Sequence, residues 1–126
     1  MAYKTFEELE TYKVAREFRK KIYVLVKKLP KHEEYNLAGQ MRRASTSLTN
    51  NIAEGHGRFH YQENIQFCRQ SRGSLAELID DINICIDERY FPDNHLYELK
   101  AEARDVLKYL NGYIAHLKRL KQKNEE

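Results

Sequence analysis

The sequence has no tryptophan, only two prolines and two cysteines, and no long apolar run. No window approaches the ~20 consecutive apolar residues of a membrane-spanning helix, and the first residues lack the basic-then-apolar order of a signal peptide. We therefore expect a cytoplasmic protein. Cys68 and Cys85 fall in one predicted helix, roughly 25 Å apart at about 1.5 Å rise per residue, which excludes a disulfide between them. Both are expected to be small core residues.

Several patterns that carry catalysis or cofactors are also missing. No Glu is followed three residues later by His, as in di-iron bundles, and no glycine-rich phosphate loop follows a strand, because no segment has strand alternation. His56 and His60 have the i, i+4 spacing of metal ligands, but Gly57 interrupts the helix that would align them. Ser47 has no predicted His partner for nucleophilic catalysis. We expect no enzyme activity, no metal and no cofactor.

Apolar residues recur at helical spacing in four segments, and the chain length of 126 residues fits one domain. The predicted helices span about 6–29, 35–55, 61–89 and 94–120. The charged tail 121–126 is expected to fray. Short connections favour an all-α, antiparallel up-down-up-down four-helix bundle that occupies residues 1–126 as a single domain.

Local signals mark the ends of these helices. Thr5 and Glu8 have the spacing of a capping box before the first helix, and Pro30 ends it. Gly55 and Gly57 are expected to close the second helix and let the chain reverse.

The second predicted helix carries a polar line beside its apolar stripe. At ~100° per residue, one narrow arc contains Gln40, Arg43, Ser47, Asn51 and Glu54. Packing around a turn at 55–60 places Arg43 beside Ser74 on the third helix and within a turn of Glu77, so we expect an Arg43–Glu77 ion pair.

These seven polar residues have two interpretations. They are either a ligand or RNA site, or a buried hydrogen-bond network that fixes the register of the bundle. The facing Ser74 and Glu77 favour a structural network, since a half-satisfied network is costly. Gly73 supports this interpretation, because a residue without a side chain allows two helices to approach closely.

Positive charge is unevenly distributed, although the formal net charge is only +3. Lys and Arg outnumber Glu from Met1 to Lys31 and recur after His116, whereas the third predicted helix is acidic. Such a distribution attracts phosphate to part of the surface. The candidate nucleic-acid contacts are Lys13, Arg16, Lys20, Lys27, Arg42, Lys118, Arg119 and Lys121. The alternative is that these residues form solvated helix faces and a charged tail.

The nine tyrosines are spread over all four predicted helices and their ends. Such residues stack on nucleic-acid bases when cations lie between them, or they lie at subunit contacts with an apolar ring and a polar tip. We favour subunit contacts, particularly for the tyrosines on the first and fourth helices.

The blocks QMRRA (40–44), NIAEG (51–55) and GSLAEL (73–78), with Pro30, Glu33, Tyr35 and Leu37, carry a family resemblance. The chain resembles a family of short bacterial four-helix bundle proteins, first known as products of intervening sequences in large-subunit ribosomal RNA genes. This resemblance covers most of the chain. It implies an antiparallel bundle that assembles as a ring-shaped homopentamer, with no known enzymatic activity and a suspected role with nucleic acid.

A related branch is similar too: the accessory variability proteins of diversity-generating retroelements, basic pentamers that bind a reverse transcriptase and its RNA. The mild net charge of this chain makes that branch the weaker match. Three positions depart from the family pattern. Asn36 stands where glycine is usual, His60 and Tyr61 replace a Ser or Thr cap region, and Ile79 replaces a frequent acidic residue. The last change argues against an acidic network beyond Glu77.

We therefore expect a non-enzymatic homo-oligomer, a pentamer by the resemblance, that binds RNA or DNA through its basic surface and makes no membrane contact. The alternative is a protein-interaction or scaffold module with an unidentified protein partner and no affinity for nucleic acid.

Overall fold

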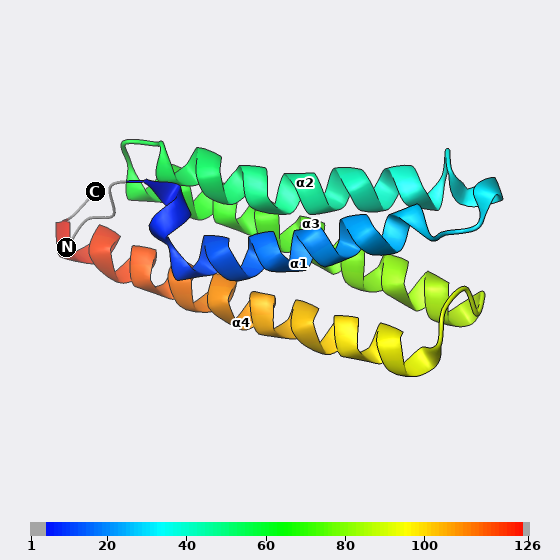
Figure 1. Cartoon of the computed structure of the whole chain (residues 1–126). Helices are drawn as coiled ribbons and strands as arrows, with labels where there is room; N and C mark the ends of the chain where they lie inside the picture. Colours follow the sequence, from blue (N-terminus) through cyan, green and yellow to red (C-terminus); the bar gives the residue numbers. More distant parts are fainter. Residues whose placement is uncertain (1–4, 125–126) are drawn as a thin grey trace.

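The computed structural model describes residues 5–124, which form four long α-helices and two short 3-10 helices (Figure 1). In chain order the elements are η1 (Phe6–Glu8), α1 (Glu10–Lys27), η2 (Lys31–Glu33), α2 (Leu37–His56), α3 (Tyr61–Asp87) and α4 (Asp93–Asn124). The predicted all-α helical bundle is confirmed. Each helix runs antiparallel to the one before it (Figure 1). Among the described residues, no helix is long and apolar enough to cross a membrane.

One apolar core runs along the bundle and receives side chains from all four helices. Phe18, Met41, Leu75 and Leu110 are fully buried in it. A smaller cluster lies near the α2–α3 turn and consists of Ile65, Cys68, Ile114 and Leu117. The predicted core positions of both cysteines are confirmed, since both are buried and free. Burial raises the pKa of Cys68 to about 12 and that of Cys85 to about 11, so both thiols keep their proton at neutral pH.

The first helix differs from its prediction at both ends. Thr5 makes no side-chain cap hydrogen bond, so the predicted capping box is not formed. The buried, extended Leu9 instead separates η1 from α1. α1 ends at Lys27, and the next two N–H groups still bond to the carbonyls of Leu25 and Val26. The helix stops there because the ring of Pro30 clashes with the residue before it when that residue is helical.

α2 continues through Gly55 to His56, so Gly55 does not reverse the chain as predicted. Its role is steric. A Cβ at Gly55 would lie 2.6 Å from Oδ1 of Asn64 and 3.1 Å from the Asn64 carbonyl oxygen, so only glycine lets α3 pack this closely on the last turn of α2. A Cβ at Gly73, in contrast, would meet nothing within 4 Å. The expectation that Gly73 allows a close helix approach is therefore wrong.

α3 ends in a Schellman motif without glycine. The N–H of Tyr90 donates to the Cys85 carbonyl at 3.1 Å, and the N–H of Arg89 donates to the Ile86 carbonyl at 3.2 Å. Arg89 has a φ of 56°, and this left-handed conformation costs a residue with a side chain roughly 1–2 kcal/mol.

The end of α4 also differs from the prediction. The described part of the tail that was expected to fray remains helical to Asn124, whereas 125–126 lie outside the described residues. Lys121 Nζ donates to Gln62 Oε1 of α3 at 2.6 Å and so ties this end of α4 to the bundle.

Candidate functional site

The predicted nucleic-acid contacts of the first helix lie on one exposed face of α1. Lys13, Arg16, Lys20 and Lys27 are separated by 3, 4 and 7 residues, and all four are exposed. This spacing returns to the same side of a helix. Lys13 and Lys20 each form an ion pair at 3.4 Å with the glutamate three residues earlier. Arg16 and Lys27 form no ion pair with any residue of the described range 5–124.

Arg42 lies beside Lys27, the last of these cations, because α1 and α2 pack in antiparallel register. The hydroxyl groups of Tyr23 and Thr46 are 2.6 Å apart. Arg42 precedes Thr46 by one turn and Lys27 follows Tyr23 by one turn, so the two cations lie at the same level of neighbouring helices. We call this surface the α1–α2 basic face, and it consists of Lys13, Arg16, Lys20, Lys27 and Arg42.

The remaining predicted contacts lie in the last turns of α4. Lys118 and Arg119 are exposed, and Lys121 is held by its hydrogen bond to α3. This end of α4 lies near the α2–α3 turn (Figure 1). The structure therefore divides the predicted contacts into two sets, one on α1 and α2 and one at the end of α4.

Ser47 is the centre of the polar contacts between α2 and α3. Ser74 Oγ donates to Ser47 Oγ at 2.8 Å, and Asn51 Nδ2 donates to both the carbonyl and Oγ of Ser47 at 2.9 Å. Ser74 therefore meets Ser47 and not Arg43 as predicted. The register between α2 and α3 differs from the predicted one for two reasons. First, α2 extends to His56. Second, side chains lean toward the N-terminus of their own helix, which displaces the contacts between antiparallel helices.

The structure does not form the predicted Arg43–Glu77 ion pair. Both side chains are exposed, and no hydrogen bond or ion pair within residues 5–124 joins them. Arg43 lies on the side of α2 that faces away from the core. Its Nη1 is 3.4 Å from the position that a Cβ would take at Gly39, so the guanidinium folds back along its own helix.

The two ends of the predicted polar line make contacts near their own positions in the chain. Gln40 donates to Asn36 Oδ1 at 3.3 Å, and Glu54 accepts a hydrogen bond from Arg58 at 2.8 Å. Of the seven predicted members, only Ser47, Asn51 and Ser74 therefore form one connected group.

Asp81 continues the polar side of α3 one turn beyond Glu77. Its residue is 6% exposed, and no hydrogen bond or ion pair with a described residue compensates its charge. Burial, with smaller contributions from the negative charges of Asp80 and Glu77, raises the pKa of Asp81 to about 6. This pKa exceeds the value of 3.8 in an unfolded chain. The carboxyl group therefore loses its proton less readily in the fold, and its ionisation destabilises the protein as the pH rises from 3.8 through about 6.

A hydrogen-bond network that was not predicted from the sequence lies at the end of the bundle where the α1–α2 and α3–α4 connections meet. The buried Glu33 carboxylate accepts from the Tyr90 hydroxyl at 2.6 Å, from Asn36 Nδ2 at 3.0 Å and from the Leu37 N–H at 3.4 Å. His32 Nε2 lies 3.1 Å from the Tyr90 hydroxyl. We call Glu33, Tyr90, Asn36 and His32 the loop-end network.

The loop-end network shifts two pKa values in opposite directions. The Tyr90 hydrogen bond, with those from Asn36 and Leu37, holds the pKa of Glu33 below its ordinary value. The same bond raises the pKa of Tyr90 to about 12. Glu33 therefore remains ionised and anchors the start of α2, where a carboxylate also complements the helix dipole. No periodic pattern signals this network, because Glu33 and Tyr90 are 57 positions apart.

At the opposite end of the bundle, the α2–α3 turn and the last turns of α4 line an open cavity of about 410 Å³. We call it the turn-end cavity. Its lining consists of His56, Arg58, Phe59, His60, Tyr61, Asn64, Tyr113, His116, Leu117 and Leu120. Imidazole and aromatic rings thus form most of its wall. The predictions did not include this cavity, and its only sequence signal is the concentration of His and aromatic residues in 56–61.

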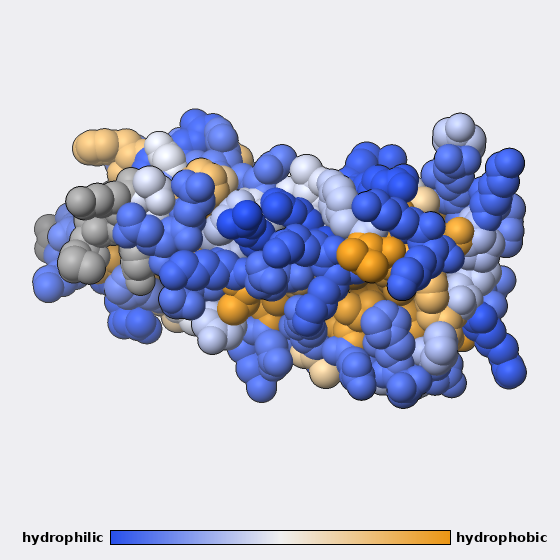
Figure 2. Space-filling view, in the orientation of Figure 1, coloured by the Kyte–Doolittle hydropathy of each residue, from blue (hydrophilic) through white to orange (hydrophobic). Residues whose placement is uncertain are grey.

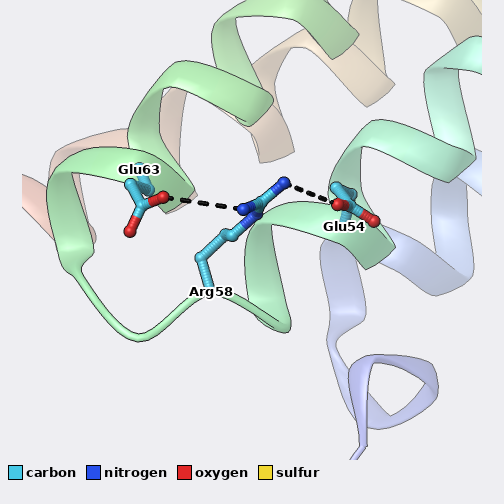
Figure 3. A network of polar contacts seen from close by, with 3 residues as sticks. All are labelled: Glu54, Arg58 and Glu63. Carbon is cyan, nitrogen blue, oxygen red and sulfur yellow. Dashed lines mark hydrogen bonds and ion pairs between the residues drawn. The ribbon is translucent and has the colours of Figure 1, made fainter.

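Arg58 is already neutralised at the edge of this cavity. Figure 3 shows its guanidinium between Glu54 of α2 and Glu63 of α3, with nitrogen–oxygen distances of 2.8 and 3.7 Å. The guanidinium also lies over the Phe67 ring, 4.8 Å from its centroid. These contacts fix Arg58 as a brace of the α2–α3 turn.

His56 and His60, whose spacing resembles that of metal ligands, both line the turn-end cavity. Within 5–124, no group of three or more His, Cys, Asp or Glu side chains is arranged to hold a metal ion.

One family model matches most of the chain. It is described as 23S rRNA-intervening sequence protein and matches residues 7–112, which include α1, α2, α3 and more than half of α4. No curated protein matches the chain.

Proposed function

The chain belongs to the family of 23S rRNA-intervening sequence proteins, and from this premise we propose that it is a non-enzymatic homo-oligomer that binds nucleic acid through the α1–α2 basic face. RNA is the first nucleic acid to test, because the family is named after an RNA gene. The resemblance of its motifs to pentameric bundles gives five as the expected number of copies.

The observation that best supports nucleic-acid binding is a set of cations without counter-charges. Arg16, Lys27 and Arg42 are exposed and form no ion pair within the described residues. Arg19 donates to Thr49 at 2.8 Å and thereby ties α1 to α2 under this surface. A rigid pair of helices that presents unpaired cations suits the phosphates of a nucleic-acid backbone, whose contacts dominate affinity.

Self-association is supported by an apolar groove between α1 and α4, the α1–α4 groove. Figure 2 shows apolar side chains gathered between these two helices. Val24 is 54% exposed, and together with Phe91 and Leu99 it lines a hollow of about 640 Å³. Val14 and Val106 line a second hollow of about 520 Å³. Exposed apolar surface of this kind commonly marks a protein interface.

The edges of the α1–α4 groove carry charges of both signs. Both edges are mixed: the α1 side carries Lys20 and Lys28 with Glu17, and the α4 side carries Asp105 with Lys108. Lys21 and Glu102 already pair with each other at 2.6 Å across the groove. In a ring of copies each contact joins two different surfaces, so this groove would form one half of the contact and a different surface of the neighbouring copy the other half.

The decisive test is salt-titrated binding to a structured RNA. We expect binding at low salt that weakens steeply as salt rises. Replacing both Arg16 and Arg42 by Ala should reduce the slope of log affinity against log salt by about 2, since each lost phosphate contact removes about 1. The charge-matched control replaces the exposed Arg69 and Arg104 by Ala and should leave the slope unchanged. Absence of binding at low salt, or equal effects of the two variants, would contradict the proposal.

Light scattering tests the oligomer independently. A pentamer has five times the chain mass of 15.1 kDa. Val24→Glu places a charge in the α1–α4 groove and should reduce the mass toward one copy, whereas Tyr35→Glu, at a 95% exposed position in the η2–α2 connection, should not. If Val24→Glu leaves the mass unchanged, this groove is not the interface.

The alternative function is a protein-interaction or scaffold module, which the α1–α4 groove also supports. In that case the wild-type protein assembles or binds another protein, yet shows no affinity for RNA or DNA at any salt concentration. The salt titration therefore separates the two functions.

A further inference from the structure

We propose that the turn-end cavity binds a nucleotide, with the base against its aromatic wall and the phosphate at its imidazole-lined edge. The nucleotide that we expect in the cavity is an unpaired residue of an RNA strand. This part of the proposal rests on the proposed nucleic-acid binding. It goes further by assigning a second, chemically different site at the end of the bundle.

The size and lining of the cavity fit a nucleotide. Its volume of about 410 Å³ lies within the range of roughly 300–1,000 Å³ typical of small-molecule sites. Phe59, Tyr61 and Tyr113 line it from the turn, α3 and α4. Phe59 is 91% exposed, and its ring touches His60 edge-on, with centroids 4.9 Å apart. An exposed aromatic ring beside a hollow is the feature that stacks on an unpaired base.

A fixed polar group lies in the same wall. The Asn64 residue is 7% exposed, its Oδ1 accepts from Cys68 Sγ at 3.5 Å, and its Nδ2 donates to the Tyr113 hydroxyl at 3.2 Å. Gly55 permits this arrangement, because any side chain there would collide with the Asn64 amide. These hydrogen bonds use the Asn64 amide within the fold, so Asn64 fixes the position of Tyr113 in the wall, and stacking on the rings is the main contact expected for a base.

Imidazole side chains line the phosphate side of the cavity, and one cation of α4 lies at its edge. His56 and His116 line it from α2 and α4. Lys118 and Arg119 are exposed within one turn of His116. Arg58 adds little attraction, since Glu54 and Glu63 balance its charge (Figure 3). At about 100° per residue, Arg119 lies near His116 on the cavity side of α4, whereas Lys118 lies toward the opposite side. Of these two predicted nucleic-acid contacts, Arg119 is therefore the one that borders the cavity.

The test compares three probes by fluorescence anisotropy and amide chemical-shift mapping: a blunt RNA duplex, the same duplex with a short single-stranded overhang, and adenosine monophosphate. The overhang should bind more tightly than the blunt duplex. Phe59→Ala should remove this advantage, about fivefold or more for one stacked base, without changing blunt-duplex affinity. The matched control Tyr35→Ala removes an equally exposed ring at the other end of the bundle and should change neither affinity.

The mononucleotide separates this proposal from the proposed function. Adenosine monophosphate should shift the amide signals of 57–64 in the wild type and not in Phe59→Ala. If these shifts appear while the duplex does not bind, the cavity is a nucleotide site and the α1–α2 basic face has no role. If the duplex binds but neither the overhang nor the mononucleotide affects the cavity, the nucleotide site is refuted. A change of oligomer mass in Phe59→Ala would also refute it, because Phe59 would then be a subunit contact.

Discussion

Both ends of the bundle contain bonded polar residues, but at the turn end these residues also line a cavity. In the loop-end network, the Glu33 carboxylate receives three hydrogen bonds from groups on both connections, so its polar atoms are consumed by the fold. At the turn end, His56, His116 and aromatic rings line a cavity. The loop-end network is closed on itself, whereas the hydrogen bonds and ion pairs of the turn end, such as Asn64–Tyr113 and Arg58–Glu54, support the wall of a hollow. The turn end therefore has the space that the proposed nucleotide site requires.

The largest expected effect is the loss of the loop-end network. Glu33→Leu removes the acceptor of Tyr90, Asn36 and the Leu37 N–H and should lower the urea midpoint more than any other substitution considered. Glu33→Gln keeps an oxygen acceptor without the charge and should lose less. Equal stabilities of wild type and Glu33→Leu would show that this end is not held by the network.

The charge of Glu33 adds a pH dependence with a defined sign. Its pKa in the fold lies below the ordinary value of 4.5, so ionised Glu33 stabilises the protein above that value and this contribution disappears as the pH falls through the lowered pKa. The stability difference between wild type and Glu33→Gln should therefore be present at neutral pH and shrink below about pH 4.5. Urea unfolding at several pH values measures it.

The next largest effect concerns the turn end. Gly55→Ala forces a Cβ against the Asn64 amide and its carbonyl oxygen, and such overpacking should cost about 1–3 kcal/mol. Gly73→Ala is the matched control in α3, where a Cβ meets nothing within 4 Å. It should stabilise the protein by about 0.5–1 kcal/mol, since alanine favours helix. Similar unfolding free energies for the two variants would contradict the steric role of Gly55.

The smallest effect tests the connection beside the loop-end network. Arg89→Gly removes the cost of the left-handed conformation at φ 56°, roughly 1–2 kcal/mol. Glycine also loses more backbone freedom on folding, so the net stabilisation should be about 0.5–1 kcal/mol. Glu88→Gly, at the preceding residue with φ −85°, gains no such relief and should be neutral or destabilising. Thermal unfolding of both variants distinguishes these outcomes.

Much of the fold could be predicted from the sequence, because each helix has its own apolar repeat. Residues such as Phe18, Leu75 and Leu110 fall on the predicted stripes and are buried. The ends of the helices were less predictable, since Thr5 and Gly55 have the residue types of caps but lie in other environments. Intrinsic preferences at helix ends are worth about 1 kcal/mol, and packing overrides them.

The candidate sites were predicted only in part. The cations of the α1–α2 basic face share one face because helical spacing alone places Lys13, Arg16, Lys20 and Lys27 together. The Arg43–Glu77 pair was wrong, because one sequence does not specify how two helices are displaced along their axes. That displacement joins Ser47 to Ser74 and leaves Arg43 in solvent.

The sequence by itself determined four amphipathic helices, a buried pair of cysteines and a basic first helix, because these depend on periodicity and composition within one segment. Only the tertiary structure decided that Glu33 meets Tyr90, and that the α2–α3 turn and α4 together line an open cavity. Contacts between distant segments depend on register and on how the helix ends pack, and neither is encoded in the repeat of any single helix.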